Sequence, residues 1–180
     1  MRLAICSMCV VVVLALASAP AGAEPAVALS GNTLLRFDTA TPATVTAHPI
    51  TGLQGAESVI GIDVRPKTGQ LFAVTVQAGA VINSPVRTYT IAPDTGAATF
   101  IGSIPATTVP GAGDVPSGID FNPAVDRIRV VNYNDENFRI NPNNGVLSGD
   151  DPALNPGGNQ IIALAYDRNT PRESAFAIPT

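Results

Sequence analysis

Two short sequence elements recur along this chain, and their spacing limits the folds that the chain can adopt. The first reads GIDVRPKTGQLFAVT around Asp63 and GIDFNPAVDRIRVVN around Asp120, and a weaker copy, LAYDRNTPRESAFAI, lies around Asp167. Each copy has an apolar segment that ends in Asp, a turn that contains Pro, and then a second segment. The aspartates are 57 and then 47 residues apart, so the period is about fifty residues. Such a period indicates a fold made of similar units.

The second element lies between copies of the first. It reads YTIAPDTGAATFIG at Tyr89–Gly102 and FRINPNNGVLSG at Phe138–Gly149, with a looser copy, LRFDTATPATVT, at Leu35–Thr46. Together the two elements make a four-stranded unit, which at this period is typical of a β-propeller blade. We therefore predict an all-β fold of propeller-like, four-stranded antiparallel blades, with about three blades present. Because closed propellers have four to eight blades, we expect a fragment, an open stack, or half of a ring made by two subunits.

The local pattern also favours strands over helices. After the first residues, no window has apolar residues at helical spacing over three turns, and Gly and Pro, 16 of each in the chain, interrupt short runs of Val, Ile, Thr and Phe. We predict strands at Leu34–Phe37, Val59–Val64, Gln70–Val76, Val86–Ala92, Ala98–Ile101, Arg127–Asn132, Asn137–Asn141 and Gln160–Tyr166.

The N-terminal segment is typical of a secretory signal. Arg2 precedes an apolar run that is too short for a membrane anchor, and Ala21-Gly22-Ala23 forms a cleavage site of the A-x-A type. We expect residues 1–23 to be removed and residues 24–180 to form one domain, truncated at its C-terminus, in a secreted or periplasmic protein. Both cysteines, Cys6 and Cys9, leave with the signal.

Charge and composition exclude several function classes. Without Arg2 the chain keeps nine basic residues against 14 acidic ones, which argues against nucleic acid as a partner. We expect no membrane span after cleavage of the signal. His48 is the only histidine, and the predicted mature chain has no cysteine, so we expect no metal site, no cofactor and no catalytic triad.

One polar stretch provides the only candidate site. Arg127 and Arg129 lie on one face of a predicted strand because side chains alternate along it. A short loop leads to the next strand, which carries Arg139. Two interpretations remain open: an ion-pair network between blades, because Arg pairs with carboxylates in a bidentate manner, or a site for an anionic ligand. The candidate ligand-binding residues are Asp120, Asp126, Arg127, Arg129 and Arg139.

These motifs also resemble a known family. GIDFNPAVDRIRVV with NFRINPNNG, TGLQGAESVIGIDVRP with TGQLFAVT, and YTIAPDTGAATFIG are similar to the signature of the bacterial DUF4394 family. The resemblance extends from Ala28 to Tyr166. It implies an exported, propeller-like β-domain with no established activity, and therefore no catalytic residues. Domains of that family continue into further repeats, which is why we expect a truncated C-terminus.

Two functions from different classes fit these observations. The first is a non-catalytic binding or scaffold module of the cell envelope, which self-associates through open blade edges. The alternative is a metal-assisted hydrolase of the lactonase-like propeller type. The hydrolase requires that polar residues from several repeats converge within metal-ligand distance. The residues available for this are Asp63, Asp120, Asp167, Asn122 and Asn132.

Overall fold

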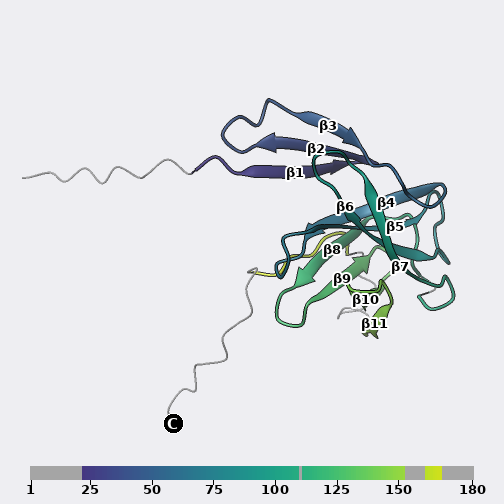
Figure 1. Cartoon of the computed structure of the whole chain (residues 1–180). Coiled ribbons are helices and arrows are strands. Elements are labelled where there is room, and N and C mark those ends of the chain that lie inside the picture. Colours follow the sequence, from purple (N-terminus) through teal and green to yellow (C-terminus); the bar gives the residue numbers. More distant parts are fainter. Residues whose placement is uncertain (1–21, 110, 153–160, 168–180) are drawn as a thin grey trace, which may run out of the picture.

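The protein consists of three antiparallel β-sheets that follow one another along the chain (Figure 1). The computed structural model describes residues 22–109, 111–152 and 161–167. Within these ranges there are eleven strands and no helix, so the all-β prediction is confirmed. No helix that could span a membrane occurs in the ranges searched. Residues 1–21 of the predicted signal lie outside the described ranges.

The first sheet has three strands. They are paired in the order β1-β2-β3, and their bounds are β1 (Pro25–Ser30), β2 (Thr33–Asp38) and β3 (Thr46–Pro49). The prediction of four strands in each unit is wrong for this sheet, because β1 has no strand partner other than β2 in the part of the chain that the structure describes. One edge of the sheet is therefore formed by β1.

The second and third sheets are four-stranded meanders of the same design. The second contains β4 (Glu57–Val64), β5 (Leu71–Gln77), β6 (Val86–Ile91) and β7 (Ala98–Ile104), and the third contains β8 (Ser117–Asn122), β9 (Arg127–Asn132), β10 (Asn137–Ile140) and β11 (Leu147–Asp150). In both, the first repeated element forms the first two strands, and the second element forms the last two. The two clear copies of each element thus fold alike.

Most of the predicted strands are present, and one is wrong. Residues 161–166 of the segment predicted as Gln160–Tyr166 form no strand, and Gln160 lies outside the described ranges. The physical reason is that a strand needs a hydrogen-bonded neighbour, whereas this segment contacts β8 without joining its sheet. The predicted strands also omit β1, β3, β8 and β11. Of these, β1, β3 and β11 are short or largely exposed, and β8 contains the apolar segment that begins the repeated element around Asp120.

Two apolar clusters join the three sheets, one on each face of the second sheet. Leu71, Ala73 and Ile91 pack toward the first sheet, and Phe72 and Val74 pack toward the third. This explains the continuous apolar sequence of β5, since a strand that is buried on both faces has no solvent side. In contrast, β9 alternates over its first four residues: Ile128 and Val130 are buried, and the two arginines are half-buried on the opposite face, so they share one face as predicted. Val131 and Asn132 are both buried.

Candidate functional site

The predicted arginines of the third sheet are bound to acidic or polar partners. Arg129 and Arg139 are cross-strand neighbours, and both contact Asp151, with N–O distances of 3.1 and 2.7 Å. Arg139 binds this carboxylate in a bidentate manner through Nε, at 2.8 Å, and Nη2. The hydrogen bond from Arg139 lowers the pKa of Asp151. Sequence reasoning did not pair Asp151 with the arginines, since it follows β11 and lies 12 residues beyond Arg139.

Asp126 takes part in an ion pair between the second and third sheets. Its carboxylate accepts hydrogen bonds from Nε of Arg65, at 2.7 Å, and from Nη2 of the same residue. The side chain of Arg65 is only 7% exposed, and its Nη2 also donates to the side chain of Asn143 at 2.9 Å. The Arg65 guanidinium lowers the pKa of Asp126. Arg127, the next residue, instead donates to Ser148 Oγ at 2.6 Å.

The aspartates of the repeats bind the backbone of the neighbouring repeat. Asp63 Oδ2 accepts the N–H of Phe121 at 2.7 Å, and Asp120 Oδ2 accepts the N–H of Tyr166. Burial, and then a hydrogen bond shared with Asp120, raise the pKa of Asp63 to about 6. These carboxylates therefore connect adjacent repeats.

The five candidate residues fall into two groups. Arg129 shares Asp151 with Arg139, and it also binds the hydroxyl of Tyr166, whose N–H is bound by Asp120. Asp126 and Arg127 have other partners. Asn122 and Asn132, which the hydrolase hypothesis also needs, accept hydrogen bonds from nearby backbone N–H groups through their side-chain oxygens. Among the residues described, no group of three or more His, Cys, Asp or Glu could hold a metal ion.

A buried polar cluster at the start of β4 was not predicted. Glu57, whose side chain is 1% exposed, accepts hydrogen bonds from Thr75 at 2.8 Å and from the Tyr89 hydroxyl at 2.9 Å, and it pairs with Arg87. Burial raises the pKa of the Tyr89 phenol. Asn32 holds this region against the first sheet, because its side chain binds the backbone of β4. The isolated Glu in ESVIGID gives a weak sequence signal for such a cluster.

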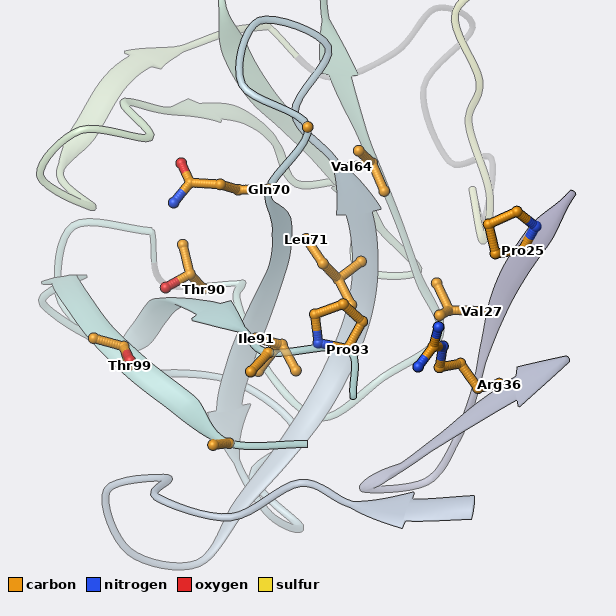
Figure 2. Close-up of a pocket in the computed structure, with 13 residues that line it drawn as sticks. Pro25, Val27, Arg36, Val64, Gln70, Leu71, Thr90, Ile91, Pro93 and Thr99 are labelled. Carbon is orange, nitrogen blue, oxygen red and sulfur yellow. The ribbon is translucent and has the colours of Figure 1, made fainter. Parts of the chain in front are cut away.

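The clearest concave site lies between the first and second sheets. It is a cleft of about 600 Å³, and Figure 2 shows residues of β1 and β2 on one side and of β5 to β7 on the other. Arg36 is the only charged residue of its lining, and it is paired with the exposed Asp94. The apolar part of the lining includes Pro25, Val27, Val64, Leu71, Ile91 and Pro93.

A sequence model of a domain of unknown function, DUF4394, matches residues 33–177. The chain belongs to the DUF4394 family. The DUF4394 match includes both four-stranded sheets and most of the cleft lining, and it begins after β1. No curated protein and no solved structure matches this chain. The recognition of the family from its repeated motifs is therefore confirmed, and the family description adds no activity.

Proposed function

We propose that this DUF4394 chain is an exported, non-catalytic binding module built from propeller-type units. The cleft between the first two sheets carries this proposal. Its volume of about 600 Å³ falls within the range that small-molecule sites usually have. Export is supported by the signal-like first 23 residues, and the propeller-type arrangement is supported by the repeated four-stranded meander.

The lining of the cleft specifies a ligand with an apolar body and one negative charge. Val27, Val64 and Pro93 offer apolar surface, and Arg36 offers a guanidinium from β2, the middle strand of the first sheet. The bond between Arg36 and Asp94 is exposed, with side-chain exposures of 39% and 72%, so a ligand carboxylate can replace Asp94 at little cost. A small amphiphilic carboxylate fits this chemistry.

The lactonase-type alternative has less support. It would use the aspartates of several repeats as metal ligands, but Asp63 and Asp120 each direct an oxygen at a backbone N–H of the adjacent repeat. A raised pKa at Asp63 also disfavours the ionised form that a metal ligand needs. The geometry favours binding over metal-assisted hydrolysis.

The proposal is tested with octanoate as the probe and octanol as its uncharged counterpart. Titration calorimetry should show saturable binding of octanoate and weaker binding of octanol. Arg36→Gln should remove the preference for the carboxylate. Ala97→Trp places a bulky ring at an exposed position of the lining and should abolish binding of both probes.

Arg127→Gln is a matched control, since Arg127 is an arginine of similar setting on the third sheet, away from the cleft. It should leave octanoate binding unchanged. Binding that survives Ala97→Trp would place the ligand outside the cleft, and absence of saturable binding of either probe would contradict the proposal.

A further inference from the structure

The three sheets differ in which strands of the repeating unit they contain. The second sequence element forms the last two strands of both four-stranded sheets, and its looser copy, LRFDTATPATVT, forms β2 and the turn toward β3. By this correspondence β1, which pairs with β2, matches the second strands β5 and β9. Among the described residues, the first sheet therefore contains strands two, three and four of a unit and has no strand one.

First strands of adjacent units lie side by side. Besides the bond from Asp63 to the Phe121 N–H, a side chain on Gly61 would collide with Ile119, so glycine permits the close approach of β4 and β8. The same relation holds between β8 and residues 161–167: Asp120 binds the Tyr166 N–H, and a side chain on Gly118 would collide with the backbone at Ala163 and Leu164. Residues 161–167 thus occupy a third first-strand place.

These contacts also correct the alignment of the weak third repeat by two residues. Phe121 corresponds to Tyr166, so Asp120 corresponds to Ala165, and not to Asp167 as the sequence motif suggests. In the register of the strands, Asp120 lies opposite Arg129 on the second strand of its sheet, and Asp63 lies opposite Phe72 in the same way.

The segment has no strand partner, and the first sheet has no first strand, in the part of the chain that is described. The strands β4 and β8 and residues 161–167 form a row. Ile162 at one end of this row is 57% exposed, and Val64 of β4 at the other end is 43% exposed. The N–H of Val64 corresponds to that of Phe121 but is bound by Asp63 of its own strand, at 2.7 Å. In a strand placed beside β4, Ala165 takes the position of the aspartate that would accept the Val64 N–H. Alanine has no carboxylate, but this N–H already has Asp63 as its acceptor.

We propose that residues 161–167 of one copy complete the first sheet of a second copy, as a strand antiparallel to its β1 and beside its β4. In the complete sheets, Asp63 lies opposite Phe72 and Asp120 lies opposite Arg129. Val27 has the same place on β1 as Phe72 on β5 and Arg129 on β9, so the added strand places Ala165 opposite Val27. Because the described residues of each copy contain one such segment and one such edge, two copies close a ring through two identical contacts. The ring contains six units, which lies within the four to eight blades of closed propellers. This inference does not depend on a ligand in the cleft, but Val27 and Val64 also line the cleft, so the added strand would occupy part of it.

The experiment measures the mass of the exported chain in solution by light scattering over a range of concentrations. The expected mass is twice that of one chain. Val27→Pro removes the backbone N–H at that position of the β1 edge, where proline is tolerated, and should give the mass of one chain. Val27→Thr keeps the N–H and a similar shape, and should remain a dimer. A monomer at every concentration would overturn the proposal.

A cysteine pair tests the strand contact itself. In a chain with Cys6 and Cys9 replaced by Ser, Val27→Cys with Ala165→Cys should form a disulfide between copies, because opposite residues of an antiparallel pair lie within disulfide range. Thr46→Cys on β3 with Ala165→Cys is the control and should form none. A disulfide within one chain, or a dimer in which both pairs fail to cross-link, would contradict the exchange of this strand.

Discussion

The two interfaces between the sheets of this protein are built differently. Between the second and third sheets, β4 lies along β8, Phe72 meets Phe121 edge to face with ring centroids 5.2 Å apart, and the buried Arg65 binds Asp126. Between the first and second sheets, the ion pair of Arg36 is exposed and a cleft of about 600 Å³ separates part of the two surfaces. The presence or absence of a first strand accounts for this difference.

The comparison shows what a complete unit contributes. A first strand brings its Asp and Gly against the next unit, so it adds backbone hydrogen bonds and close packing at the same time. The first sheet is hydrogen-bonded to β4 through Asn32, at the turn between β1 and β2, and shares an apolar cluster with it. We therefore expect changes at the second interface to cost more stability than similar changes at the first.

The largest expected effect comes from Phe121→Ala. Phe121 is 1% exposed and lies in the cluster between the second and third sheets, so its removal leaves a cavity and should lower the free energy of unfolding by about 3–5 kcal/mol. Leu29→Ala, at a half-buried position of β1 in the other interface, should cost about 1–2 kcal/mol. Urea unfolding measures both, and equal losses would contradict the comparison.

The second effect concerns the two ion pairs between sheets. Arg65→Ala leaves the carboxylate of Asp126, which is 20% exposed, without its main partner and should cost about 2–3 kcal/mol. Arg36→Ala removes an exposed pair and should cost less than about 1 kcal/mol. Thermal unfolding at low and high salt separates them, because salt screens the exposed pair more strongly.

The smallest effect is the dependence of stability on pH. The folded chain raises the pKa of Asp63 to about 6, above the value of about 3.9 of an unfolded chain, so stability should fall as the pH rises from about 4 to 6. The lowered pKa values of Asp126 and Asp151 act in the opposite direction, and their contribution is lost as the pH falls below about 4. The unfolding temperature should therefore be higher at pH 5 than at pH 7.5.

Asp63→Asn is the matching variant. It keeps an acceptor for the Phe121 N–H and removes the charge beside Asp120, so the difference between pH 5 and pH 7.5 should shrink. Asp94→Asn, at an exposed carboxylate of the first interface, should leave that difference unchanged. A wild-type protein that is more stable at pH 7.5 than at pH 5 would argue against the raised pKa of Asp63.

The sequence predicted the sheets better than it predicted the contacts between them. The repeats located the strands of the second and third sheets because strand and turn preferences are local, and the alternation of β9 placed Arg127 and Arg129 on one face. The pattern did not reveal β1, whose sequence PAVALS is short and only partly buried.

The candidate site was predicted less well, because its partners are distant in sequence. Arg65 and Asp126 are 61 residues apart, and nothing local to either indicates the other. Asp151 and Glu57 stand in segments without a repeated motif, so only the folded chain shows that they hold arginines. The lining of the cleft likewise comes from strands of two sheets.

Native-state hydrogen exchange shows whether the first sheet, which has no first strand among the described residues, is held less firmly than the other two. The measurement compares amides of β2 with those of β5 and β9, at a protein concentration low enough to keep single copies. We predict that β2 exchanges through an opening of lower free energy than the opening that exposes β5 and β9, which should be the global unfolding. Equal protection of all three strands would contradict this account.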